Sequence, residues 1–162
     1  MRINLRYLPK ILTRKDRRSQ GSELLKSRRF YKKGIYHSRP KIKSFKSKKS
    51  KHIIKAEKIY KVYKIGATDE LAKATGCTKE TLAKIINKGE GAYFSSGSRP
   101  NQSAQSWGVA RLASAITSGK AAAVDYNILE KGCKPKSKAF TLAKKSRKKH
   151  GHGTRKAPKV NF

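Results

Sequence analysis

Acidic residues are scarce in this chain. Of its 162 residues only 9 are Asp or Glu, against 42 Lys or Arg, and the formal net charge at pH 7 is +33. The local spacing of these few carboxylates suggests no acid pair, and no Cys-His or Ser-His-Asp set is suggested either. We therefore expect a protein that is not an enzyme and that binds nucleic acid or an acidic protein surface.

Cysteine, histidine and long apolar runs are also scarce. Cys77 and Cys133 are too few for a disulfide framework, and with His150 and His152 they match no paired zinc-ligand spacing. We expect two small buried thiols in a reducing compartment, no metal and no cofactor. The first residues lack the apolar core of a signal peptide, and apolar runs of a few residues are too short for a membrane span. No phosphate-binding glycine-rich loop of the G-x-x-x-x-G-K-[ST] type is present, and a small-molecule ligand is not expected.

Charge divides the chain into three parts. Residues 1–65 contain 23 Lys or Arg and 3 acids, residues 66–133 contain 8 and 6, and residues 134–162 contain 11 and none. We predict a mainly α fold, in which 66–133 form a small compact helical domain. A long, extended basic N-terminal arm with short helices precedes this domain at 1–65, and a basic C-terminal helix and tail follow it at 134–162.

The N-terminal segment has weak local signals. Thr13, with Asp16 three residues on, predicts a helix start, and Gly21 predicts a break into one or two short helices. The stretch "YHSRPKIKSFKSKKS" predicts extended chain, because Pro40 disfavours helix before it and the Lys-Ser alternation has no apolar face. The stretch "HIIKAEKIYKVYKI" predicts a short helix that becomes a strand over 60–65.

Capping residues predict the helices of the rest of the chain. Each expected helix begins at a Ser, Thr or Gly and most end at a glycine. The expected segments are "DELAKAT" between Thr68 and Gly76, "KETLAKIINK" between Thr78 and Gly89, 103–117, "KAAAVDYNILEK" between Gly119 and Gly132, and Ser137 to about Lys149.

Apolar spacing predicts the buried faces of these helices. Residues at the i, i+3, i+4, i+7 positions share one side of a helix. For the last three helices the expected inward residues are Val109, Leu112, Ala113 and Ile116, then Ala121, Val124 and Ile128, and finally Phe140 and Leu142.

Residues 70–89, "ELAKATGCTKETLAKIINKG", have the composition of a helix-turn-helix. Two short helices meet at a turn around Gly76, and the second would present its polar side to a DNA groove. Lys84 and Asn87 are the candidate base or phosphate contacts on that side. An ordinary helical hairpin needs the same glycine and alanine for packing, so both interpretations stay open.

Candidate nucleic-acid contacts lie in three basic clusters, "TRKDRR", "KSKKSKHIIK" and "KKSRKKHGHGTRK", and in the possible helix-turn-helix. Clustered Lys and Arg gain affinity for phosphates by releasing condensed counterions, although any one cluster is equally typical of a solvated tail. The candidates are Arg17, Arg18, Lys48, Lys49, Lys79, Lys84, Asn87, Lys88, Lys148 and Lys149.

One long stretch, "GAYFSSGSRPNQSAQSWGVARLAS" at 91–114, contains Arg99 and Arg111 as its only charged residues. We interpret it as an ordered loop, with its aromatic residues packed beneath, followed by a helix of small residues that allow close packing. It is a candidate docking surface for another protein through Tyr93, Phe94, Arg99, Trp107 and Arg111.

This stretch and the N-terminal segment resemble a known family. "GAYFSSGSRPNQSAQSWGVARLASAITSGKAAAVDYNIL" is similar to the signature block of a family of small basic proteins of unknown function encoded by large DNA viruses of algae and protists. "YLPKILTRKDRRSQGSELLKSRRFYKKGIYHSRPKIKSFKSKKSKH" is similar to the N-terminal part of the same family. The resemblance covers nearly the whole chain and implies a viral origin and a role in the virion or near the viral genome.

Two functions are expected from these observations. The first is a non-enzymatic viral structural protein, a minor capsid component on the inner side of the shell whose cationic arms bridge other capsid proteins and meet the genome. Its locations would be the virion and, during assembly, the host cytoplasm or nucleus. The alternative is a protein that binds or condenses double-stranded DNA through the helix-turn-helix.

Overall fold

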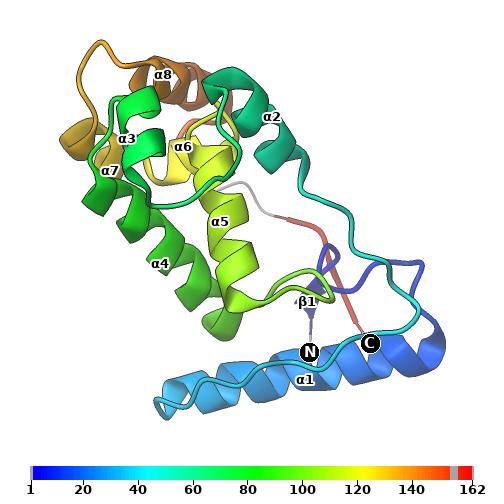
Figure 1. Cartoon of the computed structure of the whole chain (residues 1–162). Helices are drawn as coiled ribbons and strands as arrows, with labels where there is room; N and C mark the ends of the chain where they lie inside the picture. The colour runs from blue at the N-terminus through cyan, green and yellow to red at the C-terminus, as the bar shows by residue number, and fades with distance from the viewer. Residues whose placement is uncertain (1, 154–156, 162) are drawn as a thin grey trace. The chain divides into compact units, whose positions relative to one another are not determined.

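The computed structural model describes residues 2–153 and 157–161 of the chain. This described part is mainly helical, with α1 to α8 and two short strands, as the capping pattern predicted. It forms two compact units (Figure 1). Unit 1 takes residues up to 48, 90–107 and the C-terminal segment from 157, and unit 2 takes 49–89 and 108–153. Packing therefore groups segments that are far apart in sequence, whereas the three parts inferred from charge are continuous.

Unit 1 is built on one long helix, α1 (Arg14–Lys32). The Asp16 backbone N–H donates to Thr13 Oγ1 at 3.2 Å, so the predicted cap is confirmed. The predicted break at Gly21 is wrong, because α1 runs through it and Gly21 is buried there. Burial of this face offsets the roughly 1 kcal/mol that a helical glycine costs relative to alanine.

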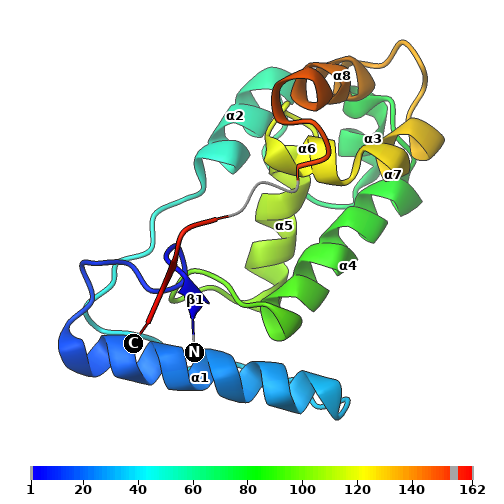
Figure 2. The ribbon, with the colours of Figure 1, turned by 180° about the vertical axis from the view of Figure 1, so that it is seen from behind.

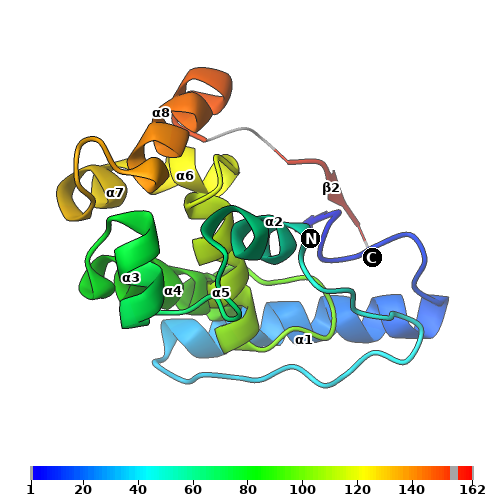
Figure 3. The ribbon, with the colours of Figure 1, turned by 45° about the horizontal axis from the view of Figure 1, so that its top comes forward.

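A two-stranded sheet joins the ends of the chain in unit 1. β1 (Ile3–Asn4) pairs antiparallel with β2 (Lys159–Val160), with Ile3 opposite Val160. Figure 3 shows β2 in the C-terminal segment. Ile3, Tyr7, Leu8 and Leu24 form a small buried core, and Trp107 packs against it. The N-terminal segment is thus folded against other parts of its own chain.

Residues 36–50 contain no helix or strand, as predicted, and hydrogen bonds attach the part up to residue 48 to the rest of unit 1. The Asn101 side chain accepts from Ile42 N at 2.6 Å and donates to the Ile42 and Phe45 carbonyls. Asp16 accepts from Ser44 N at 3.0 Å, and hydrogen bonds from Ser44 lower the pKa of Asp16. We call residues 35–48 the strap.

Arg39 fixes the strap to the stretch 91–114, which contains few charged residues. Its guanidinium donates to Ser27 Oγ, the Tyr93 carbonyl and Ser98 Oγ at 2.8 to 3.0 Å, and it lies 3.8 Å from the centre of the Tyr93 ring. Burial lowers the pKa of Arg39. The polar residues of the stretch thus replace water around a buried cation.

Unit 2 packs the remaining helices around one apolar core. These are α2 (Lys51–Tyr60), α3 (Asp69–Thr75), α6 (Lys120–Val124), α7 (Tyr126–Gly132), α8 (Lys138–His150), most of α4 (Lys79–Ser95) and most of α5 (Ala104–Ala115). Figure 2 shows α6, α7 and α8 grouped together. Leu71, Leu82, Ile85, Leu112 and Leu129 are fully buried in this core.

The predicted helix caps of this part of the chain are present, but one helix does not end at the glycine where its end was predicted. Thr68, Thr78, Ser103 and Ser137 each accept a hydrogen bond from the backbone N–H three residues on. The predicted end of a helix at Gly89 is wrong, because α4 continues to Ser95. A Cβ on Gly89 would lie 2.5 Å from the Gly108 Cα, so this glycine serves the close crossing of α4 and α5.

The single helix predicted over 120–131 is two short helices, α6 and α7, that meet at Asp125. Val124, predicted to face inward, is exposed, whereas Ala122, Ala123 and Leu129 are buried. Asp125 lies at the junction with φ of −96° and ψ of 19°, outside helical geometry, and its buried carboxylate binds Arg111 and Lys88.

Cys77 and Cys133 form a disulfide, so the prediction of two free packing thiols is wrong. Backbone hydrogen bonds from Thr78 N to the Gly132 carbonyl and from Lys134 N to the Gly76 carbonyl place the two cysteines side by side. The cysteines are 56 residues apart in sequence, and local spacing gave no sign of this contact.

The strand predicted over 60–65 is also absent. Tyr60 ends α2, Lys61 takes the left-handed conformation with φ of 53°, and the chain continues without regular structure. Val62 and Ile65 are buried in the core of unit 2, which accounts for the apolar pattern there. Among the described residues we find no helix with the length and apolar character needed to cross a membrane.

Candidate anion-binding site

A tight turn in unit 2 connects α5 to α6 through residues 116–119. Gly119 N donates to the Ser114 carbonyl at 2.9 Å, and Ser118 takes a left-handed φ of 59°. A Cβ on Gly119 would lie 2.2 Å from Ser114 Oγ, so glycine is required here. Thr117 donates its hydroxyl to the Ala113 carbonyl, which closes the end of α5.

Two helices are anchored to this turn by side-chain hydrogen bonds. The Tyr60 hydroxyl of α2 donates to the Ile116 carbonyl at 2.5 Å, and burial raises the pKa of Tyr60. The Ser146 hydroxyl of α8 donates to the Gly119 carbonyl at 2.6 Å. The turn is therefore fixed from both sides, and α2 and α8 flank it.

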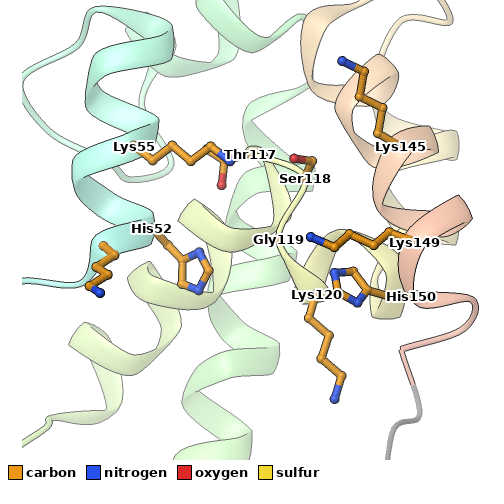
Figure 4. A pocket seen from close by; sticks show the side chains of 10 residues that line it. His52, Lys55, Thr117, Ser118, Gly119, Lys120, Lys145, Lys149 and His150 are labelled. Atoms are coloured by element: carbon orange, nitrogen blue, oxygen red, sulfur yellow. The ribbon is translucent and has the colours of Figure 1, made fainter.

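These three elements line an open basic pocket of about 620 Å³, which we call the basin (Figure 4). Figure 4 shows Lys55 and His52 reaching from α2 toward the turn, and Lys149 reaching from α8 toward Gly119. The residues that line the basin are Lys51, His52, Lys55, Thr117, Ser118, Gly119, Lys120, Lys145, Lys149 and His150.

The charged side chains that line the basin are all basic. Five of the ten lining residues are lysines and two are histidines, and none of the described residues that line it is acidic. Lys51, Lys55, Lys145 and Lys149 are exposed. Because cations crowded together repel one another, such a cavity favours an anion that brings several negative charges, such as successive phosphates.

The predicted nucleic-acid contacts are dispersed, and among them only Lys149 lines the basin. Lys148 is exposed on α8, Lys48 is exposed at the end of the strap, and Arg18 is exposed on α1. Two further candidates have structural partners. Lys49 forms an ion pair with Glu57 at 2.8 Å, and Arg17 donates to the carbonyls of Leu8 and Asn161.

The helix-turn-helix candidates lie on α4 as predicted, but not as a uniformly basic face. Lys84 and Asn87 are exposed. Lys79 lies 3.4 Å from Asp69, and Lys88 binds the buried Asp125. Three exposed acids, Asp69, Glu70 and Glu80, are presented by the same hairpin.

The residues proposed for docking are divided between the two units. Tyr93 is buried and holds Arg39, and Phe94 packs edge-on against Tyr93 with 4.9 Å between ring centres. Trp107 contacts Tyr7 edge-on, and Arg99 is exposed. Arg111 belongs to unit 2, where it binds Asp125. Most of the proposed docking residues therefore have partners within their own unit.

Sequence reasoning missed most of the basin. Its lysines do show a local pattern, since Lys51 and Lys55 on α2, and Lys145 and Lys149 on α8, are each four residues apart and so share a helix face. The convergence of these two faces on the α5–α6 turn depends on tertiary contacts. Of the C-terminal basic cluster, residues 154–156 lie outside the described residues.

No group of three or more His, Cys, Asp or Glu within the described residues could hold a metal ion. A comparison with curated proteins and with solved structures finds no match for this chain. A comparison with family models matches residues 5–131 to DUF5824, a family of unknown function. Because this match covers well over half of the sequence, including the strap and the α5–α6 turn, the chain belongs to the DUF5824 family.

Proposed function

We propose that this protein binds the phosphate backbone of nucleic acid, and that the basin in unit 2 is its principal contact. The observation that carries the proposal is the convergence of five lysines and two histidines from three elements on one cavity with no acidic lining residue. A net charge of +33 adds long-range attraction to any polyanion. The proposed role is binding, without a catalytic step.

Binding through the α3–α4 hairpin is the alternative, and the charges favour the basin over it. The hairpin exposes Asp69, Glu70 and Glu80 beside its lysines, and these acids would repel a phosphate backbone. Counterion release rewards cations that are clustered together, as they are in the basin.

A role inside a viral capsid stays a prediction that rests on the family resemblance. That prediction used a free N-terminal arm to bridge neighbouring proteins. The N-terminal segment instead makes contacts within unit 1 at several points, which are the sheet, the Arg39 contacts and the Asn101 contacts. Viral origin also stays a prediction.

The salt dependence of duplex DNA binding by the full-length protein tests the proposal. A double variant, Lys55→Ala with Lys149→Ala, removes two exposed basin lysines. Its control, Lys73→Ala with Lys84→Ala, removes two exposed lysines of α3 and α4 and leaves the same net charge. Each lysine that contacts a phosphate contributes about 0.9 to the slope of log K against log salt.

We expect the basin variant to lower the magnitude of that slope by about 2. The hairpin variant should keep nearly the wild-type slope. An equal decrease of the slope in both variants would mean that net charge alone controls binding. A larger loss in the hairpin variant would support the helix-turn-helix, and either result would contradict the basin.

A further inference from the structure

Unit 1 has an exposed aromatic cluster that neither its core nor the basin accounts for. Tyr31 is 38 % exposed and Tyr36 is 70 % exposed, and Ile35 lies exposed between them in sequence. Tyr31 is in the last turn of α1, and Tyr36 follows the turn at Gly34. Phe94, near the end of α4, completes the cluster.

The Tyr36 ring is held in place although it is exposed. It lies 5.1 Å from the Phe94 ring and 6.1 Å from the Tyr31 ring, centre to centre. The turn that positions it is closed by hydrogen bonds from Ile35 N to the Phe30 carbonyl and from Gly34 N to the Tyr31 carbonyl. A ring ordered before binding loses little conformational entropy when a ligand stacks on it.

Positive charge surrounds the cluster along the sequence. Arg28, Arg29, Lys32 and Lys33 occupy the last turns and the C-cap of α1, beside Tyr31. The described part of unit 1 contains three acids, of which Asp16 lies in the first turn of α1. Glu23 is paired with His37 at 2.5 Å, and Glu90 lies one helical turn before Phe94 on α4. Cations therefore outnumber acids around the aromatic rings.

Exposed aromatic rings beside Lys and Arg side chains are suited to a single-stranded nucleic acid, which offers both unpaired bases and phosphates. Unpaired bases stack on aromatic side chains, while the phosphates that follow them are neutralised by Lys and Arg. A duplex offers only the phosphates, because its bases are already stacked on one another. A protein partner would gain from the apolar rings but would have to bury or pair four cations.

We propose that Tyr36, supported by Tyr31 and Phe94, is a base-stacking platform for single-stranded nucleic acid. The adjacent cations Arg28, Arg29, Lys32 and Lys33 follow the backbone. This site lies in unit 1 and does not depend on the basin in unit 2. It gives the protein a preference for unpaired strands that a purely electrostatic site does not provide.

The test compares full-length variants on two probes of equal length and charge, a short oligothymidylate and the corresponding abasic oligomer. The variants are Tyr36→Ala, Tyr36→Leu and Tyr36→Phe. The matched control is Tyr63→Ala, since Tyr63 is 99 % exposed in unit 2 and also lies among lysines. Circular dichroism and sedimentation of each free variant check folding and self-association.

We expect Tyr36→Ala and Tyr36→Leu to weaken oligothymidylate binding by at least about fivefold, since a stacked base contributes that much or more. Tyr36→Phe should bind like the wild type, and no variant should change binding to the abasic oligomer. Tyr63→Ala should be neutral on both probes.

Three results would overturn the proposal. The first is an equal loss on both probes, which would mean that Tyr36 supports the fold or the phosphate contacts. The second is no loss on either probe. The third is a change in self-association of Tyr36→Ala with unchanged oligothymidylate binding, which would make the cluster a contact between protein copies.

Discussion

Asp125 connects four helices of unit 2, α4 to α7, and its removal should loosen the elements that carry the α5–α6 turn. Its carboxylate is fully buried and lies 2.8 Å from both Nε and Nη2 of Arg111, and 3.0 Å from Lys88 Nζ. Arg111 is on α5, Lys88 is on α4, and Asp125 separates α6 from α7.

The magnitude follows from how exposed the two cations are. The Lys88 side chain is 47 % exposed, so its ion pair contributes about 0 to 1 kcal/mol. The Arg111 pair is bidentate and largely buried, and breaking such a pair costs about 3 to 5 kcal/mol. Because Arg111 retains some contact with water, we expect Asp125→Ala to cost about 3 kcal/mol, the lower end of that range.

Hydrogen exchange of the full-length protein measures this cost where it arises. In Asp125→Ala the slowest amides of α5, α6 and α7 should exchange roughly a hundredfold faster, because each 1.4 kcal/mol is a factor of ten. Lys88→Ala should change the same amides less than tenfold. Glu130→Ala, which removes an exposed acid of α7, is the matched control and should have little effect.

The double variant Asp125→Ala with Arg111→Met separates the pair from its surroundings. Its loss of stability should be clearly smaller than the sum of the two single losses, because no buried charge is left unpaired, and Lys88, which also loses its partner, is about half exposed to water. The reasoning is refuted if Asp125→Ala behaves like Glu130→Ala, or if the two single effects simply add.

Two further predictions concern backbone packing and pH. Gly89→Ala should destabilise the protein by about 1 to 2 kcal/mol, because its Cβ would lie 2.5 Å from Gly108 Cα. Gly91→Ala on the same helix meets no atom closer than 3.8 Å and should stabilise the protein by roughly 0.5 to 1 kcal/mol. Urea denaturation compares the two variants, and equal effects on the free energy of unfolding would contradict the close crossing of α4 and α5. Asp16→Asn tests the strap, because hydrogen bonds from Ser44 lower the pKa of Asp16 below 3.8. The stability that the wild type gains over this variant should be constant above about pH 4 and decline as the pH falls below that value, and an advantage that persists unchanged to pH 2 would contradict it.

The sequence predicted those features of the fold that depend on neighbouring residues. Thr13, Thr68, Thr78 and Ser103 cap helices as expected, because each hydrogen bond reaches only three residues along the chain. Gly89 misled the prediction, since a glycine at a helix crossing and a glycine at a helix end look the same in sequence.

Features that join distant segments were not predictable in this way. The Cys77–Cys133 disulfide needs the ends of α3 and α7 to lie side by side. The basin needs Tyr60 to bind the carbonyl of Ile116 and Ser146 to bind the carbonyl of Gly119. Clusters of lysine in the sequence indicated that the protein binds a polyanion, but tertiary contacts decide which lysines face one cavity.

Lysine footprinting of the full-length protein tests the proposed basin most directly. The protein is acylated with and without a saturating DNA duplex, and the modification of each lysine is read by peptide mass spectrometry. We predict strong protection of Lys51, Lys55, Lys145 and Lys149, with Lys73, Lys84 and Lys131 modified equally in both samples. Protection that is uniform over all exposed lysines, or that is concentrated on Lys84 and its neighbours in α4, would contradict the basin as the principal contact.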